Sequence, residues 1–256
     1  MLSLCAAAQP KAETATAFDH YVQEAEARIE REQNSTELFL ALPSFSGSSG
    51  LWERVRRGEV VVEKRGSTPA SVPGGLIHDW LGVALIPGAT LSQVIAFVQD
   101  YDHMAPHFQP EMISSRLLSR SGDDFRIAMR LRKHKVVTVV LDTEYDVHYG
   151  QLDAAHVYSR SYSTRIAEIA NAGRADEHAL APGADHGFLW RLNSYWRFEQ
   201  IPEGVVVQCE AISLTRGIPT GLGWLIGPFV HQIPRESLQF TLSSTRRGVL
   251  ERVGQH

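Results

Sequence analysis

The sequence predicts an α+β domain in which a curved antiparallel β-sheet packs against a long C-terminal helix. Strand-like segments follow one another from residue 112 to residue 216 with no helical segment between them. Short turns between consecutive strands are typical of an antiparallel meander. A sheet with an apolar face needs a cover, and the apolar stretch after residue 216 is the long candidate left in this region.

The composition is that of an ordinary globular protein. The chain has 256 residues, 43% of them hydrophobic and 21% charged, and a net charge of -4. This charge gives no electrostatic reason to expect a nucleic-acid partner. The longest apolar run of the C-terminal stretch, Leu222–Val230, is far shorter than the roughly 20 residues of a bilayer span, so no transmembrane segment is expected. Cys5 and Cys209 do not make a disulfide framework.

Residues 1–16 are expected to lie outside the folded domain. Three alanines, Ala6 to Ala8, follow a short apolar start, as at the end of a signal peptide, but a charged start and most of an apolar core are missing. Two interpretations stay open. The segment is either the end of an export leader, which would make the protein exported or periplasmic, or a disordered tail on an otherwise cytoplasmic protein.

Residues 17–75 are expected to form a region ahead of the main domain. Ala15–Gln33 carries apolar residues at helical spacing and predicts an extra N-terminal helix. Leu42–Gly50 predicts a loop, and Gly58–Arg65 predicts an added edge strand. Gly66–Gly75 is rich in Pro, Gly and Ser and predicts a linker.

Residues 76–253 are expected to form one domain. It opens with a strand over Ile77–Pro87 and an amphipathic helix over Thr90–Met104. The expected strands that follow are Met112–Ser121, Phe125–His134, Val136–Gly150, Ala155–Ile169, Phe188–Ile201 and Gly204–Arg216. Several of them alternate in polarity, as a strand does when one face is buried.

The stretch Gly217–Leu238 combines large apolar residues with four glycines and three prolines. Proline suits the first turn of a helix and breaks its interior. The sequence therefore predicts two helical pieces, 219–231 and 234–250, bent around Gly227–Pro228. Each glycine costs a helix about 1 kcal/mol relative to alanine. Such a cost is tolerated where a helix approaches a sheet closely or leaves room for a cavity.

Two segments carry a resemblance to a known superfamily. "VQDYDHMAPHFQPEMISSRLLSRSGDDFRI" (Val98–Ile127) is similar to a first helix that crosses into a strand, and "LTRGIPTGLGWLIGPFVHQIPRESLQFTLSSTRRGVL" (Leu214–Leu250) to the junction with a final helix. Together with the order of the elements, they resemble the START-like (SRPBCC) superfamily of lipid-transfer and polyketide cyclase-like proteins. The resemblance covers roughly residues 76–253 and implies a helix-grip fold, in which the sheet wraps around the C-terminal helix. It does not select a function, because this superfamily includes carriers, receptors and enzymes.

The expected site is a cavity between the sheet and the C-terminal helix. Alternation suggests that aromatic residues of the sheet face apolar residues of the helix there, and that Arg160 lies between two of these tyrosines. Arg160 would then hold a ligand carboxylate or phosphate, or pair with Glu210. In the alternative register, Arg160 points to solvent and the neighbouring serines point inward. The candidate ligand-binding residues are Tyr145, Tyr158, Arg160, Tyr162, Trp196, Leu222, Trp224, Leu225 and Phe229.

Few residues suggest catalysis or metal binding. His103, His107 and Glu111 are spaced as metal ligands on a helix would be, but prolines interrupt that segment, so no metal site is expected. No cofactor motif is present. An apolar, aromatic lining with few polar groups suits binding or transport of a hydrophobic small molecule or lipid. The alternative is a cyclase, aromatase or hydrolase on the same scaffold, which would need acid and base groups in the cavity.

Overall fold

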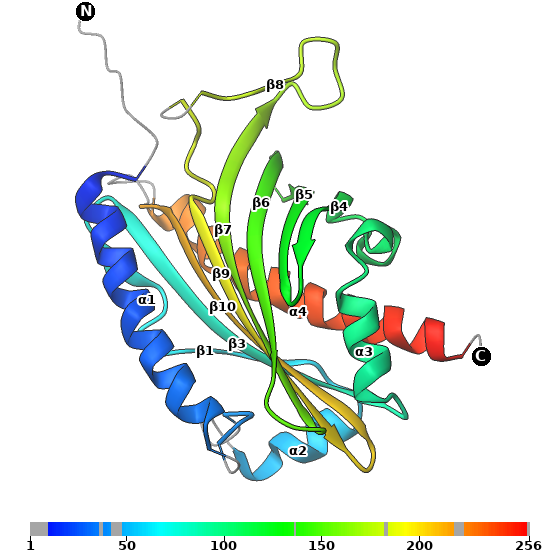
Figure 1. The fold of residues 1–256 in the computed structure, drawn as a ribbon. Helices are drawn as coiled ribbons and strands as arrows, with labels where there is room; N and C mark the ends of the chain where they lie inside the picture. The colour runs from blue at the N-terminus through cyan, green and yellow to red at the C-terminus, as the bar shows by residue number, and fades with distance from the viewer. Residues whose placement is uncertain are drawn as a thin grey trace, which may run out of the picture.

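A computed structural model of the chain describes residues 10–35, 38–41, 48–135, 137–181, 184–217 and 223–254, with backbone only for residues 48–49 and 223–231. The expected α+β class is confirmed. The described residues form a ten-stranded sheet with the strand order β1-β3-β10-β9-β7-β6-β5-β4, while β2 pairs with β3 and β8 with β7. All pairs are antiparallel. Figure 1 shows the strong twist of this sheet.

The strands agree closely with the segments expected from alternation. They are β1 (Val61–Lys64), β2 (Ala70–Val72), β3 (Gly75–Pro87), β4 (Met112–Ser121), β5 (Asp124–His134), β6 (Thr138–Gln151), β7 (His156–Ala170), β8 (His178–Ala179), β9 (Arg191–Ile201) and β10 (Gly204–Arg216). The expected linker Gly66–Gly75 contains β2, which forms a hairpin with the start of β3. β1 pairs with β3 and lies at one end of the strand order, within the range Gly58–Arg65 expected to form an added edge strand.

The helices are α1 (Ala12–Gln33), α2 (Ser48–Arg56), α3 (Leu91–Val98) and α4 (Gly223–Val253). Thr90 caps α3: its side chain accepts a hydrogen bond from the Gln93 backbone, and the Gln93 side chain accepts one from the Thr90 backbone. The helix expected to reach Met104 ends at Val98 and continues as two short 3₁₀ turns, η2 (Tyr101–His103) and η3 (Ala105–Phe108). The sequence missed α2, whose first residues fall in the expected loop.

The C-terminal segment forms one helix of 31 residues, so the prediction of two helical pieces is wrong. Pro228 and Pro234 each lack the backbone N–H of a helical hydrogen bond, but they do not end α4. The burial of Leu238, Leu242 and Val249 against the sheet and α3 stabilises its second half. In the described part of the chain, no helix is both long and apolar enough to cross a bilayer.

The two faces of the sheet have different covers. We call the "α4 face" the side that packs against α3 and α4, and the "α1 face" the side that packs against α1 and α2. Leu242 lies directly over Gly82 of β3, and a side chain at Gly82 would collide with it. The absent side chain therefore lets α4 approach the sheet closely. Figure 1 shows α4 crossing behind the strands, with α1 along the opposite side.

Helix α1 begins at Ala12, inside the segment that the sequence assigned to a leader or tail. Thr14, in its first turn, is buried, and its hydroxyl donates to the Pro73 carbonyl at 2.5 Å. Phe18, Val22 and Ile29 form the apolar stripe that packs on the sheet. Residues 12–16 are therefore part of the folded structure.

Candidate functional site

Strand pairing aligns residues of β3, β10, β9, β7 and β6 in three rows on the α4 face. Residues directly opposite one another in antiparallel strands point to the same side of the sheet. The middle row is Trp80, Ala211, Ser194, Ser161 and Val147, and the next row is Gly82, Cys209, Trp196, Ser159 and Tyr149. The third row begins with His78, Ser213 and Leu192 and ends with Ser163 and Tyr145.

Part of these rows is only half-buried, although the rows lie on the α4 face, which is covered by helices. We call this part the "Trp80–Trp196 patch"; its residues are Trp80, Ser161, Ser163, Leu192, Ser194, Trp196 and Ala211. Small side chains occupy its middle, and tryptophan or leucine side chains flank them. Beyond the patch, Cys209 and Ser159 are fully enclosed. The patch is therefore a region of the α4 face where the core is incompletely covered.

The patch carries polar groups but no formal charge. Trp80 Nε1 is buried and has no hydrogen-bond partner among the described residues. Ser163 Oγ accepts a hydrogen bond from the Leu192 backbone at 3.0 Å, which leaves its O–H able to donate. The other two serines add hydroxyls that can donate or accept. The patch therefore combines apolar surface with hydrogen-bonding groups.

Of the residues predicted from the sequence, Tyr145 and Trp196 lie on the α4 face. Trp196 belongs to the patch and stacks on Phe198 with ring centroids 5.9 Å apart. Tyr145 is buried at the end of its row, and burial raises its pKa to about 12. Leu222 lies outside the described residues, as do the side chains of Trp224, Leu225 and Phe229.

Tyr158, Arg160 and Tyr162 lie on the α1 face, so their expected grouping with Trp196 is wrong. Arg160 pairs with Tyr195 in the register of β7 and β9, and Tyr162 OH donates to Glu26 of α1 at 2.7 Å. The Arg160 guanidinium lies over the Tyr158 ring at 5.7 Å. The inward residues of β7 are its serines, which is the alternative register left open by the sequence.

The α1 face instead holds a buried group of ion pairs, which we call the "α1 ion cluster" (Arg28, Glu32, Arg65, Arg197 and Glu210). Arg28 of α1 binds both carboxylate oxygens of Glu210 at 2.5 and 3.2 Å. Glu32 of α1 accepts from Arg197 at 2.7 Å and from Arg65 at 3.0 Å. Although burial opposes it, these arginines lower the pKa of Glu32.

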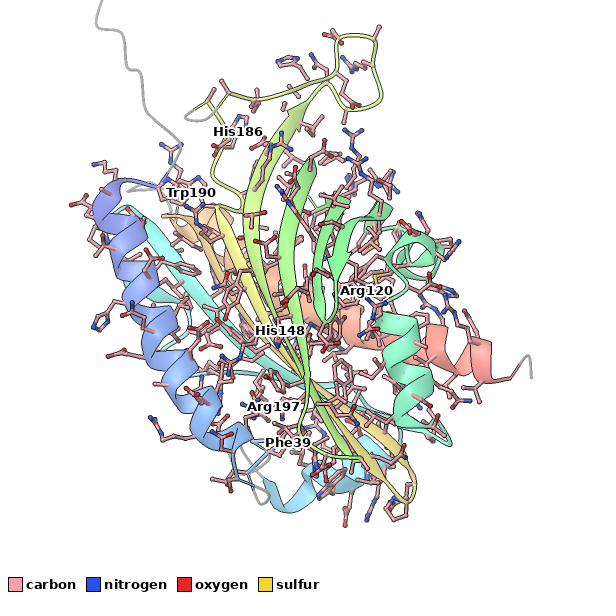
Figure 2. All side chains as sticks on the ribbon, viewed as in Figure 1. Phe39, Arg120, His148, His186, Trp190 and Arg197 are labelled. Atoms are coloured by element: carbon pink, nitrogen blue, oxygen red, sulfur yellow. The ribbon has the colours of Figure 1, made fainter. Side chains whose placement is uncertain are left out.

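Arg197 also connects α1 to the segment after it. Its Nη1 donates to the Phe39 carbonyl at 2.7 Å, and Figure 2 shows these two residues close together below the centre of the sheet. The α1 ion cluster therefore holds α1 and residues 38–41 against the α1 face of the sheet. The Glu210 carboxylate belongs to this cluster, where it pairs with Arg28 and Arg65 and not with Arg160.

Two surface cavities lie away from the patch, where α4 meets the residues in and just before β1. One, of about 450 Å³, is lined by Arg54, Arg235, Gln239 and residues 59–63. The other, of about 630 Å³, shares Val60 and Gln239 with it and extends along α4 to Glu251. Arg54 pairs with Glu59 at 2.9 Å, and Arg247 with Glu251 at 3.9 Å. Since each cavity is lined by both basic and acidic side chains, neither suggests a ligand of a particular charge.

The three residues with metal-like spacing have separate partners. His103 contacts Asp100 at 2.7 Å, His107 contacts Glu251 at 3.1 Å, and Glu111 accepts from Lys133 at 2.5 Å. Within the described ranges, no three His, Cys, Asp or Glu side chains are placed to share a metal ion. The prolines that interrupt the segment explain this separation, because they prevent the continuous helix that would align the three side chains.

The chain is similar to several solved structures at low identity. It is 16% identical to TTHA0849 from Thermus thermophilus, covering 67% of this chain and 97% of that one, with a TM-score of 0.49. It is 17% identical to a STAR-related lipid transfer protein from Xanthomonas axonopodis, covering 74% and 98%, with a TM-score of 0.46. It is 15% identical to the di-domain ARO/CYC protein BexL, with 68% of this chain and 48% of that one covered and a TM-score of 0.45. No protein-family model matches the chain, and no curated protein matches it.

The strand order and the position of α4 define a helix-grip fold, which is the fold that the resemblance implied. A single antiparallel sheet begins with β3, continues after α3 as a meander and ends against a long C-terminal helix, as the sequence predicted. Helix α1 and strand β1 are additions ahead of this core. The sequence missed Trp80 and the serines of the patch. Their alternation within each strand is visible, but their proximity depends on pairing between strands.

Proposed function

We propose that the protein binds a hydrophobic small molecule or lipid between the sheet and α4, over the Trp80–Trp196 patch. The observation that carries this proposal is the partial exposure of Trp80, Trp196 and Leu192 on a face that otherwise packs into the core. An apolar and aromatic lining with a few polar groups is typical of small-molecule sites. A bound apolar molecule would remove this remaining surface from water.

From the sequence-based candidates, the proposed site keeps Trp196 and Tyr145. The sequence-based candidates for the opposite wall are Leu222, Trp224, Leu225 and Phe229. Tyr158, Arg160 and Tyr162 do not belong to it, because the sheet itself separates them from the patch. The similar structures include both a lipid transfer protein and ARO/CYC proteins, and the similarity does not decide between a carrier and an enzyme.

A cyclase, aromatase or hydrolase would need proton donors and acceptors beside the ligand. The patch contains no carboxylate. The histidine on the same face, His78, is fully buried, and its Nε2 lies 3.1 Å from Thr215 Oγ1. The described residues therefore favour binding without catalysis.

The proposal can be tested by filling the patch. Ser194→Trp places a large ring in its middle, and we expect the protein to lose most of its binding of the neutral dye Nile red, measured by fluorescence titration. Ser114→Trp is the matched control, because Ser114 is exposed on β4 and lies outside the patch. Native mass spectrometry of the purified protein would show whether a molecule co-purifies. If the wild-type protein takes up no dye and carries no molecule, the proposal is wrong.

A further inference from the structure

The charges of the central strands are divided between the two faces of the sheet. On the α4 face, β3 presents Leu76, His78, Trp80, Gly82, Ala84 and Ile86. On the same face, β10 presents apolar residues together with Cys209, Ser213 and Thr215, none of which carries a formal charge. Charged residues of β3, β9 and β10, namely Asp79, Arg197 and Glu210, point to the α1 face and form hydrogen bonds there. The central part of the α4 face therefore carries no Asp, Glu, Lys or Arg among the described residues.

The chain segment that precedes the buried half of α4 has a single ionisable side chain, His231. Residues 218–231 contain no Asp, Glu, Lys or Arg. Arg160, the cation expected to hold an acidic ligand, contacts Tyr158 on the other side of the sheet. A carboxylate or phosphate placed over the patch would lose its hydration without gaining a counter-charge, which is strongly unfavourable. A neutral ligand has no such cost.

The polar groups of the patch suit a ligand that carries neutral oxygen atoms. Trp80 Nε1 is a buried donor with no acceptor among the described residues, and a buried donor is costly to leave unpaired. Ser194 and Ser161 are direct neighbours in the same row; Ser194 lies two strands away from Trp80, and Ser161 lies three strands away. A carbonyl, ester or hydroxyl oxygen of a ligand can accept from the indole N–H, and the serine hydroxyls can bond to further oxygens.

On the basis of the proposed function, we propose that the patch selects an electrically neutral apolar ligand with hydrogen-bonding oxygen atoms, and that it rejects the corresponding acid. Trp80 is the residue that recognises an oxygen of this ligand. The apolar surface supplies affinity for any hydrophobic molecule, whereas the missing counter-charge discriminates against anions.

The experiment compares cis-parinaric acid with its methyl ester, two fluorescent molecules with the same apolar chain. At about pH 8 the acid is ionised, and we expect the ester to bind at least about ten-fold more tightly. Equal binding, or tighter binding of the acid, would overturn the selection for neutral ligands and leave the proposed function standing. If neither probe binds and Nile red does not bind, the proposed function itself fails.

A second comparison tests the role of Trp80. Trp80→Phe keeps an aromatic ring but removes the indole N–H, and we expect it to weaken the ester about three-fold to ten-fold. Pyrene, which has no oxygen, should bind the variant as it binds the wild-type protein. Trp190→Phe is the control: Trp190 lies on the α1 face and its Nε1 donates to Asp185 at 3.2 Å. An unchanged affinity of Trp80→Phe for the ester, with circular dichroism showing a folded protein, would refute the assignment.

Discussion

Asp79 is a buried carboxyl group on the α1 face, close to Tyr21 and to the carboxylate of Glu210. Its Oδ2 accepts a hydrogen bond from Tyr21 of α1 at 2.9 Å, while its Oδ1 has no partner among the described residues. Burial, and then the negative charge of Glu210, raise the pKa of Asp79 to about 8. The folded protein therefore holds a proton on Asp79 at a pH where the unfolded chain has lost it.

This proton makes stability depend on pH. Because the folded pKa lies above the unfolded value, the contribution of Asp79 is fully present below about pH 4 and is lost as pH rises through about 8. Asp79→Asn should remove this component, so its free energy of unfolding should fall less than that of the wild-type protein between pH 5 and pH 9. Urea denaturation across this range measures the difference, with Asp146→Asn at the exposed surface as the control. Parallel curves for the wild-type protein and Asp79→Asn would contradict the prediction.

Helix α4 is held against the sheet by close contact at one strand. Leu242 and Leu238 pack over Gly82, and Gly248, further along α4, lies against the Phe97 ring of α3. Gly82 thus allows α4 to approach β3 closely, and Gly248 allows α4 to approach α3 closely. The sequence analysis had assigned this role to glycines near the start of the helix. Gly221 lies outside the described residues, and around Gly223 and Gly227 only the backbone is described.

Gly82→Ala tests the contact between α4 and β3. The added methyl group would overlap Leu242, and we expect a loss of about 1–3 kcal/mol in the free energy of unfolding. Leu242→Ala should cost about 2–5 kcal/mol alone, because it leaves a cavity, but the double variant should lose less than the sum of the two. Gly50→Ala in α2 is the control, since a methyl group there meets no atom within 4 Å. Additive effects in the double variant would show that the two residues do not interact.

The whole molecule is a sheet with a different helix on each face, and α1 is joined to it by buried charges. The α1 ion cluster connects Arg28 and Glu32 of α1 with β9, β10 and the segment after β1. Separating α1 from the sheet would remove Glu32 from Arg197 and Arg28 from Glu210, and breaking buried ion pairs in this way is costly. We therefore expect α1 and the sheet to unfold together.

Arg197→Met should lower the global stability by about 3 kcal/mol, because it leaves the Glu32 carboxylate with fewer partners and frees the Phe39 carbonyl. Amide hydrogen exchange should show equal losses of protection in α1, at Val22 and Ala25, and in the sheet, at Val207. Arg126→Met is the control, because its ion pair with Glu144 is exposed and should contribute less than about 1 kcal/mol. A loss confined to α1 would mean that this helix opens by itself.

The sequence by itself determined the α+β class, the approximate ranges of the long strands and the helical character of the C-terminal segment, because periodicity and turn residues are local signals. Only the tertiary structure decided which face each side chain occupies. In β7, alternation separates Tyr158, Arg160 and Tyr162 from the serines, but it cannot say which set faces α4 when both faces are covered. Helix α1 lies far from β7 in the sequence, and its Glu26 binds Tyr162 only once both are folded. For the same reason the patch, built by pairing four strands, has no signal in any single segment.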